Sequence, residues 1–248
     1  MKKKRRLLIS IITVSLNQPK IVNNFKSLRE QTYKNFEHIV IDGGSTDKTI
    51  NIIKKNSKNI SFWQSKKDRG IYDAINIGIR KSKGQIIGIL NADDVYYKNA
   101  LEIVSRYFEK KNIDFLFGTV RKDRVLHGFW PNKIKWKFNI YPSHSGGFFI
   151  TKKAQKKIGY YNLKFKYSSD RDLIYRMIVK HKLSGECTKK NEVLSKFDTH
   201  GISSKVGFFE RLFEETRIRV NNNQNIFFVF SLVIAHTVNR FLNLFITK

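Results

Sequence analysis

The sequence contains little cysteine and few acidic residues. Its 248 residues include one cysteine, Cys187. That count excludes an intramolecular disulfide framework and any cysteine-based zinc cluster, and it suits a reducing, cytoplasmic setting. Asp and Glu number 20 against 48 Lys and Arg, which gives a formal net charge of +28. Such a surplus attracts polyanions: nucleic acid, anionic lipid surfaces or phosphorylated ligands.

A clear targeting segment and a long apolar run are also lacking. The stretch MKKKRRLLISIITVSL is basic and then apolar, but Ser10 and Thr13 interrupt it and no small-residue cleavage site follows. It is better interpreted as a first β-strand. Near the C-terminus, the apolar run IFFVFSLVIAHTV ends at Asn239 and Arg240. A spanning helix needs about 20 apolar residues, so we expect an amphipathic helix in the membrane interface, with a buried oligomerisation helix as the alternative.

Strand and helix patterns alternate up to about residue 120. Buried-type strands are expected at 7–14, 37–41, 61–65, 86–90 and 114–120, with helices between them. This order predicts a parallel, doubly wound α/β sheet. Beyond it we expect a hairpin or loop at 124–138, a strand and short helix after His144, a helix at 168–182 and an amphipathic segment at 206–220.

Polar side chains follow the ends of the first four strands. Ligands of a doubly wound sheet bind beyond the carboxyl ends of its strands, so these side chains are candidate site residues. The first strand ends near Thr13, Ser15 and Asn17, and the second ends at Asp42. The third and fourth strands lead to Lys66, Lys67, Asp68, Arg69, Asn91, Asp93 and Asp94. Acidic groups therefore gather on one rim of a basic protein.

Two interpretations compete for the adjacent Asp93 and Asp94. One carboxylate can cap the following helix. Two neighbouring carboxylates on a half-buried rim repel each other unless a cation is present, and Mn²⁺ and Mg²⁺ prefer oxygen ligands. The rim position therefore favours a metal, Mn²⁺ or Mg²⁺, over the cap, which stays the alternative. For Asp42 the alternative is a turn with Gly43 and Gly44.

Several segments carry a family resemblance when taken in order. They are TVSLN, SLREQTYKNFEHIVIDGGSTDKT and KDRGIYDAINIGIRKSKGQIIGILNADD. Together they resemble glycosyltransferase family 2, the inverting enzymes with the GT-A fold. HSGGFFITKKAQKKIGYYNLKFKYSSDRDLIYRM resembles the acceptor-side half of the same family. The D-x-G-I-Y-D-A-x-N element before N-A-D-D is similar to members that build bacterial surface polysaccharides.

The resemblance implies a fold and a division of the chain. The fold is α/β, a GT-A (Rossmann-like), mostly parallel sheet flanked by helices, with a C-terminal amphipathic helical extension. A glycosyltransferase domain at 1–205 comprises a nucleotide-sugar-binding half at 1–95 and an acceptor-side half at 96–205. The extension, at 206–248, is expected to associate with the membrane.

The resemblance also implies a donor site. Its D-x-D motif falls on Asn91, Ala92 and Asp93, with Asn91 in place of the usual first Asp. Asp93 then coordinates the metal that bridges the diphosphate, with Asp94 as ligand or support. His200, in THGISS, resembles a loop that closes over the donor phosphates. The expected donor-binding residues are Thr13, Ser15, Asn17, Asp42, Lys67, Asp68, Asn91, Asp93 and His200.

Inverting transfer needs a carboxylate that takes the proton of the attacking hydroxyl. The family's base matches Asp170 in SSDRDL, with Ser169 where relatives have Glu. Helix capping is the alternative role for Asp170. Asp172 is the competing candidate, but a first-turn acid favoured by the helix dipole is the simpler interpretation of it.

His144 and Trp130 are the expected acceptor-binding residues. His144 precedes the SGGFF strand, where relatives place a polar residue in the acceptor cleft, and a structural hydrogen bond is its alternative. Trp130 lies in a basic loop, where it can stack on a sugar ring or serve as a core or interface anchor.

The expected activity is therefore a metal-dependent inverting transfer of a sugar from a nucleotide-diphosphate donor, a UDP-sugar, to a hydroxyl of a glycan or a polyprenyl- or lipid-linked acceptor. We expect the pathway to be surface polysaccharide or lipopolysaccharide biosynthesis. We expect the protein to be cytoplasmic and to bind peripherally to the inner face of the cell membrane. We expect no nucleic-acid partner. The alternatives are a basic nucleic-acid-binding protein, a nucleotidyltransferase and a non-catalytic relative; rim carboxylates that repel phosphate argue against the first.

Overall fold

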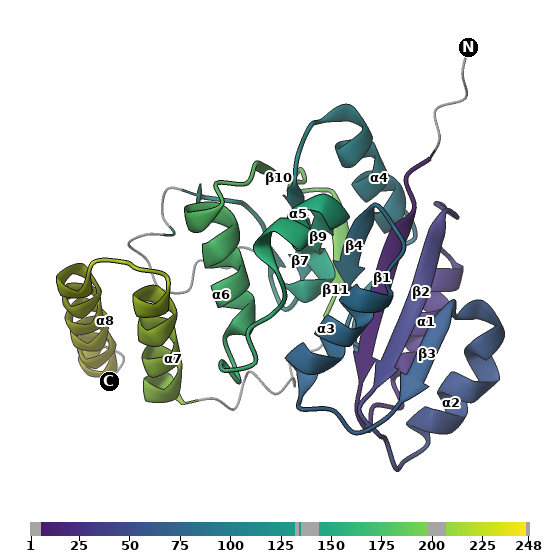
Figure 1. Cartoon of the computed structure of the whole chain (residues 1–248), viewed down its shortest axis with the longest axis horizontal. Helices are drawn as coiled ribbons and strands as arrows, with labels where there is room; N and C mark the ends of the chain where they lie inside the picture. Colours follow the sequence, from purple (N-terminus) through teal and green to yellow (C-terminus); the bar gives the residue numbers. More distant parts are fainter. Residues whose placement is uncertain (1–5, 132–133, 135–143, 198–206, 247–248) are drawn as a thin grey trace.

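The computed structural model describes residues 6–131, 134, 144–197 and 207–246, with side chains up to residue 242. A seven-stranded sheet forms its centre (Figure 1). The strands run in the order β10 (Gly185–Cys187), β6 (Phe115–Phe117), β9 (Phe148–Thr151), β4 (Ile86–Ile89), β1 (Ile9–Ser15), β2 (Phe36–Asp42) and β3 (Phe62–Ser65). All pairings are parallel except those of β9 with β4 and β6. The expected mostly parallel α/β sheet is confirmed.

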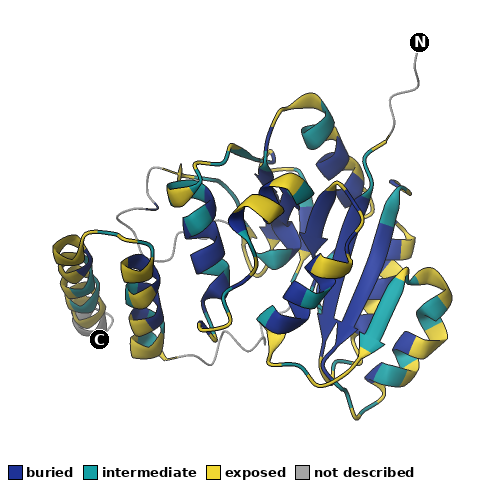
Figure 2. Ribbon diagram, in the orientation of Figure 1, coloured by how far each residue is buried: buried dark blue, intermediate teal, exposed yellow. Residues whose placement is uncertain are grey.

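Helices cover both faces of this sheet. One face carries α3 (Ile71–Lys81), α5 (Lys152–Ile158) and α6 (Ser169–Tyr175). The other face carries α1 (Ile21–Arg29), α2 (Thr49–Asn56) with a following 3₁₀ turn η1 (Ser57–Asn59), and α4 (Ala100–Lys110). Because both faces are covered, every residue of the central strands β1 and β4 is buried, rather than every second one, and Figure 2 shows these strands buried.

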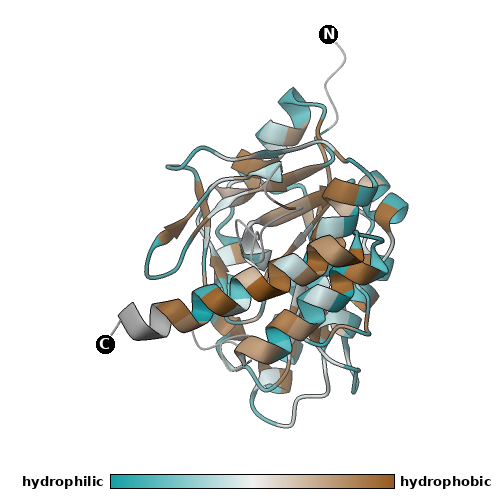
Figure 3. Cartoon of the chain, turned by 90° about the vertical axis from the view of Figure 1, so that its left-hand side faces the viewer, coloured by the Kyte–Doolittle hydropathy of each residue, from teal (hydrophilic) through white to brown (hydrophobic). Residues whose placement is uncertain are grey.

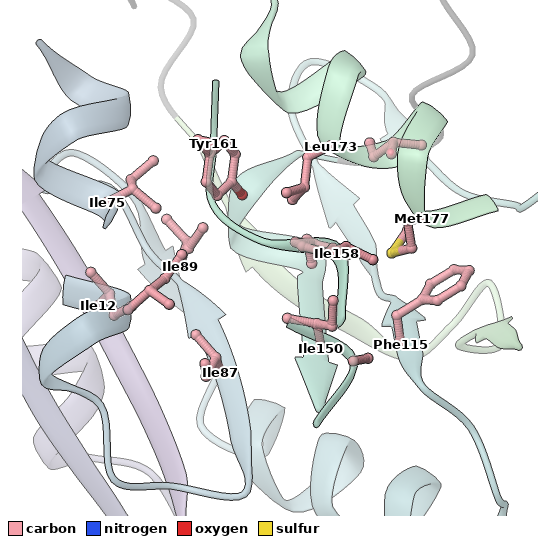
Figure 4. Close-up of a cluster of buried hydrophobic side chains, with 14 of the residues drawn as sticks. Ile12, Ile75, Ile87, Ile89, Phe115, Ile150, Ile158, Tyr161, Leu173 and Met177 are labelled. Carbon is pink, nitrogen blue, oxygen red and sulfur yellow. The ribbon is translucent and has the colours of Figure 1, made fainter. Parts of the chain in front are cut away.

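The larger core lies between the sheet and the first helical layer (Figure 4). Ile12 from β1, Ile75 from α3 and Ile89 from β4 are drawn there together with Leu173 from α6. Each of these side chains is buried. This packing fixes α3, which follows Asp68, and α6, which carries Asp170 in its first turn, against the strands that carry other candidates.

A second, four-stranded sheet was not predicted. Its order is β5 (Val95–Tyr96), β11 (Val193–Lys196), β7 (Thr119–Arg121) and β8 (Val125–Leu126). The strand expected at 114–120 is thus divided between two sheets, which corrects the prediction. It breaks at Gly118, where a Cβ atom would collide with the Leu194 side chain, so the chain crosses from one sheet to the other at a residue without one.

The predicted helix at 168–182 is also divided. α6 ends at Tyr175, and Arg176–Lys180 forms a π-helical turn, η4. There the N–H of His181 donates to the carbonyl of Arg176, five residues earlier.

Two helices complete the described chain. α7 (Phe208–Asn221) packs beside α6, and α8 (Ile226–Ile246) lies beyond α7 as the outermost element (Figures 1 and 3). Asn225 caps α8, since its Oδ1 accepts from the backbone N–H groups of Phe227 and Phe228. The expected C-terminal helical extension is confirmed. None of the helices in the described ranges combines the length and apolarity needed to cross a bilayer.

Candidate active site

The carboxyl ends of β1, β2 and β3 bring two candidate residues, Ser15 and Asp42, into one row with Ser65. Ser15 pairs in register with Asp42, and Asp42 pairs with Ser65. The turn that follows β4 joins the same edge, because the N–H of Ala92 donates to the carbonyl of Val14. This is the edge at which ligands of parallel α/β sheets bind.

Asp42 is fully buried at this edge. Its Oδ2 accepts from the backbone N–H groups of Gly44 and Ser45 and from the Ser65 hydroxyl at 2.6 Å, and its Oδ1 accepts from the Ser45 hydroxyl. The carboxylate therefore closes the turn after β2, which is the alternative role considered for it. Its contact with a nucleobase stays a prediction.

Asp68 reaches the same edge from the loop after β3. A Cβ atom at Gly43 would lie 2.9 Å from Asp68 Oδ2, so the glycine leaves room for this carboxylate. Asp68 Oδ1 accepts from the N–H of Gly70, the residue that begins α3. Burial raises the pKa of Asp68, and the charges of Asp73 and Asp42 raise it further. The neighbouring Lys67 is exposed.

Thr13 and Ser15 differ in their surroundings although both lie on β1. The Thr13 hydroxyl is 2.9 Å from His38 Nε2 and donates to Asn24 Oδ1 at 3.3 Å, so it has partners inside the helix–sheet layer. The Ser15 hydroxyl is buried and has no hydrogen-bond partner among the described residues. Of the two, Ser15 is the one with hydrogen-bonding capacity to offer a ligand.

Asn17 fastens the end of β1 to the turn after β2. Its backbone adopts the left-handed conformation, with φ of 48°. Its N–H donates to the Ser45 hydroxyl, and its Oδ1 accepts from the N–H of Thr46. Asn17 therefore shapes the rim, and its contact with a donor stays a prediction.

The turn at 91–94 is held from both sides. Asn24 on α1 donates through Nδ2 to the carbonyls of Asn91 and Asp94, at 2.9 and 3.2 Å. On the other side, Asn91 Nδ2 donates to the Ser145 hydroxyl at 3.0 Å. Asn91 Oδ1 is buried and has no hydrogen-bond partner within the described ranges. Asn24 and Ser145 were not singled out from the sequence, since only the folded turn brings them to it.

The two carboxylates of this turn differ in burial. Asp93 is half-buried, whereas Asp94 is 1% exposed. Asp94 Oδ2 lies 3.4 Å from His144 Nδ1. His144 was predicted to line the acceptor cleft, and the structure places it beside a candidate metal ligand.

His144 is held as a neutral ring. Its imidazole stacks on Phe197 with ring centroids 4.1 Å apart and lies at the start of η3 (Ser145–Gly147). Burial lowers the pKa of His144 to about 4, and the positive charge of Lys122 contributes. At neutral pH its contact with Asp94 is therefore one between a neutral ring and a carboxylate.

Asp170 lies at the second position of α6, so it is not the N-cap residue, which is Ser168. Its Oδ1 accepts from the N–H of Arg171 and from the hydroxyl of Tyr72, at 2.9 and 3.2 Å. Because Tyr72 belongs to the first turn of α3, this bond connects Asp170 to the element that follows Asp68. Burial raises the pKa of Asp170.

Asp172 has structural partners. Its carboxylate is 2.8 Å from Arg176 Nε and accepts from Nδ2 of Asn222, the C-cap residue of α7, at 3.1 Å. It is 2% exposed, so it ties α6 to its own next turn and to α7. Among the two acids of this segment, Asp170 is the one that contacts Tyr72.

Trp130 and His200 remain, and of these two the structure describes Trp130. Trp130 is 54% exposed, beyond β8, and its ring covers Gly128. His200 lies outside the described residues. A cavity of about 300 Å³ lies near the opposite ends of the strands, against Phe36, His38 and Ser61, and it contains none of the candidates.

Comparisons with known proteins bear on the family and the fold of the chain. The sequence profile of glycosyl transferase family 2 matches residues 10–172. An uncharacterised glycosyltransferase of Mycobacterium tuberculosis is 32% identical over 212 residues, which cover 79% of this chain and 77% of the relative. The Escherichia coli protein WfgD, named as a UDP-Glc:alpha-D-GlcNAc-diphosphoundecaprenol beta-1,3-glucosyltransferase, is 30% identical over 113 residues, 45% of each chain.

Solved structures share the fold at low identity. Residues 1–349 of Staphylococcus aureus TarS, in complex with UDP-GlcNAc, match with a TM-score of 0.69 and 15% identity, over 91% of this chain and 70% of that one. The chain spans 43% of a longer TarS structure. The Pyrobaculum calidifontis mannosyltransferase PcManGT, in complex with GDP-Man and Mn²⁺, matches with a TM-score of 0.68 and 15% identity, over 93% and 70%.

Proposed function

Since the chain belongs to glycosyl transferase family 2 and is therefore a glycosyltransferase, we propose that it moves a sugar from a UDP-sugar to a hydroxyl of a glycan or lipid-linked acceptor. The observation that supports this most is the meeting of Ser15, Asp42 and the 91–94 turn on one sheet edge, with Asp170 joined to that edge through α3. The pathway that we propose is surface polysaccharide synthesis.

The donor lies along the carboxyl ends of β1, β2 and β4. Ser15 offers a hydroxyl to the nucleoside, and Asp68 offers a carboxylate oxygen beside Gly43. Lys67 supplies positive charge near the diphosphate. UDP is preferred as the nucleotide because the WfgD name and the TarS complex both contain it, whereas PcManGT was solved with GDP-Man.

The 91–94 turn fits a divalent cation. Asp93 and Asp94 provide carboxylate oxygens, and Asn91 Oδ1 is a buried amide oxygen without a hydrogen-bond partner in the described structure. The described residues contain no group of three acidic, His or Cys side chains around one point, which suits an ion completed by phosphate oxygens. When bound, Mn²⁺ or Mg²⁺ supplies charge that stabilises the leaving diphosphate.

Asp170 acts as the base. It takes the proton of the acceptor hydroxyl while the oxygen forms a bond to the anomeric carbon from the side opposite the diphosphate. The bond from the anomeric carbon to the diphosphate oxygen breaks, so the anomeric configuration inverts. The raised pKa of Asp170 increases its affinity for the proton in the transition state.

The acceptor side lies toward the membrane. On α8, large apolar side chains are exposed along one stripe at helical spacing, and this stripe consists of Phe227, Phe230, Ile234, Val238 and Phe241. The opposite side of α8 packs on α7, where His236 stacks on Phe208. Figure 3 shows α8 running across the end of the molecule.

An anionic lipid surface is the occupant that charge favours for this stripe. The protein carries a net charge of +28, so a second copy is repelled and an anionic bilayer is attracted. An amphipathic helix of this kind lies in the interface rather than across it. Docking there places the enzyme peripherally on the inner face of the cell membrane, where a polyprenyl-linked acceptor is presented.

The activity is tested by calorimetric titration of UDP and of GDP, each with and without Mn²⁺. We expect Mn²⁺-dependent binding of UDP by the wild type, loss of binding in Asp93→Ala, and no loss in Asp123→Ala, an exposed carboxylate in the β7–β8 turn. Asp170→Asn should bind UDP normally but transfer no sugar. Absence of nucleotide binding with metal present would contradict the proposal.

The membrane contact is tested by co-sedimentation with vesicles that contain phosphatidylglycerol. Wild type should pellet with the vesicles, and Phe227→Ser with Phe230→Ser should stay in solution. Val22→Ser with Leu163→Ser, which removes exposed apolar side chains elsewhere, should behave as wild type. A wild-type dimer that the α8 variant converts to monomer, with unchanged sedimentation, would identify the stripe as a self-association surface.

A further inference from the structure

Tyr72, which was not among the predicted site residues, contacts the proposed base. Its hydroxyl lies 3.2 Å from Asp170 Oδ1 and 3.1 Å from the carbonyl of Tyr167. One proton serves both acceptors, so the hydroxyl bridges the carboxylate and the backbone that leads to it. The Tyr72 ring stacks on that of Tyr161, with centroids 5.5 Å apart and planes 15° apart, which fixes where the hydroxyl points.

Glu214 holds the same segment from the other side. This residue of α7 is 9% exposed, and its carboxylate accepts from the backbone N–H groups of Lys166 and Tyr167, at 2.7 and 3.0 Å. A buried carboxylate with two N–H donors is a strong, charge-assisted contact. The next residue after Tyr167 is Ser168, the N-cap of the helix that presents Asp170 in its first turn.

We propose that Tyr72 and Glu214 are positioning residues for the base: together they hold residues 166–170 and aim the Asp170 carboxylate at the acceptor hydroxyl. This inference rests on the proposed role of Asp170 as the base. It also assigns α7 to the catalytic unit, so the functional boundary of the domain lies beyond the predicted residue 205. α7 then positions the base on one side and packs against α8, the helix proposed to face the membrane, on the other.

The charges around Asp170 set the direction of the expected pH effect. The titratable and charged groups that face the segment from α3, the 159–167 loop, α6, α7 and α8 are Tyr72, Tyr161, Arg171, Arg211, Glu214, Glu215 and His236. Arg171 pairs with Glu215, which keeps the guanidinium in place beside Asp170. The Tyr72 hydroxyl stabilises the ionised carboxylate, so its removal raises the pKa of Asp170.

The first test replaces Tyr72 by Phe. The base must be ionised, so activity falls on the acid side as Asp170 gains a proton, and a higher pKa moves that limb to higher pH. We expect Tyr72→Phe to lower kcat about 10-fold and shift the acid limb of kcat/KM upward. The Kd for UDP with Mn²⁺ should stay at its wild-type value. Tyr107→Phe is the matched control, because it removes a hydroxyl that donates to Glu192 away from the site.

The second test replaces Glu214 by Gln. The amide can accept one N–H but presents its own hydrogens to the other, so the 166–170 segment is held less firmly. We expect kcat to fall about 10-fold with UDP affinity unchanged. Glu37→Gln is the matched control: Glu37 is also 9% exposed and accepts from two successive N–H groups, those of Lys83 and Gly84, far from the base. It should keep wild-type kcat at a temperature where circular dichroism shows all variants folded.

Asp170→Asn, measured in the same series, separates the base role of Asp170 from the positioning role of Tyr72 and Glu214. If Asp170→Asn is inactive while Tyr72→Phe keeps the wild-type kcat and pH profile, the positioning role is overturned and the base assignment stands. If Asp170→Asn retains activity, the base assignment fails and the positioning role fails with it. If Glu37→Gln loses kcat as Glu214→Gln does, the effect is one of general stability, and the role of Glu214 is overturned.

Discussion

At the scale of single residues, the buried Asp42 carboxylate on the sheet edge depends on its hydrogen bonds for stability. It is fully buried, and four hydrogen bonds from the 43–45 turn and Ser65 offset its desolvation. Asp42→Asn places an amide NH₂ against groups that donate, so we expect a loss of about 2 kcal/mol in the free energy of unfolding. Urea denaturation measures this. Asp123→Asn, at an exposed carboxylate in the β7–β8 turn, should change stability little, and equal effects of the two would contradict the assigned contacts.

His38 makes the free energy of unfolding sensitive to acid. It is buried between Thr13 and Phe25, and burial lowers its pKa from 6.5 to about 3. The unfolded chain therefore binds a proton at His38 between these values and the folded protein does not, so stability falls as pH falls from 6.5 toward 3. We expect about 2 kcal/mol of loss from this residue between pH 7 and pH 5. Denaturant unfolding at both pH values should show a smaller difference in His38→Gln than in wild type.

At the scale of elements, the contact of α3 with β1 decides how the site is assembled. A Cβ atom at Gly78 would collide with the Ile12 side chain, which has no exposed surface. Alanine favours a helix by about 1 kcal/mol relative to glycine, but overpacking a closed core costs about 1–3 kcal/mol. We therefore expect Gly78→Ala to lower the thermal unfolding midpoint. Asn51→Ala, on the exposed side of α2, should raise it slightly; a stabilised Gly78→Ala would show that α3 can shift away from β1.

The elements that were predicted from sequence are those with a strong local pattern. β1, β2 and β4 are short runs rich in Ile and Val that lead to polar residues, so both the parallel sheet and its candidate edge follow from them. The small sheet does not follow, because its strands are two to four residues long and β11 pairs with β5 and β7 from distant parts of the chain. His144 and Tyr72 were placed by similarly distant contacts, with Asp94 and Asp170. The order of residue types along the chain does not indicate such contacts.

At the scale of the whole molecule, positive charge and an apolar helix act at different ranges. The net charge of +28 attracts an anionic surface over roughly a Debye length, about 10 Å at 0.1 M salt. The stripe on α8 contributes only on contact, through burial of side chains such as Phe227, which is 81% exposed. In the proposed docking, charge therefore governs how often the enzyme reaches the membrane, and the stripe governs how long it stays there.

This division predicts different salt responses for two kinds of acceptor. With a lipid-linked acceptor in anionic vesicles, raising NaCl from 0.05 to about 0.5 M shortens the Debye length and should raise the apparent KM for acceptor several-fold. With a water-soluble acceptor that lacks the lipid, and with donor saturating, kcat should be nearly unaffected, because no membrane encounter is needed. The variant with serine at positions 227 and 230 should already show a high KM for the lipid-linked acceptor at low salt and normal kcat for the soluble one. If salt lowered both activities in parallel, its action would lie in the catalytic site, and the surplus charge would serve substrate binding rather than docking.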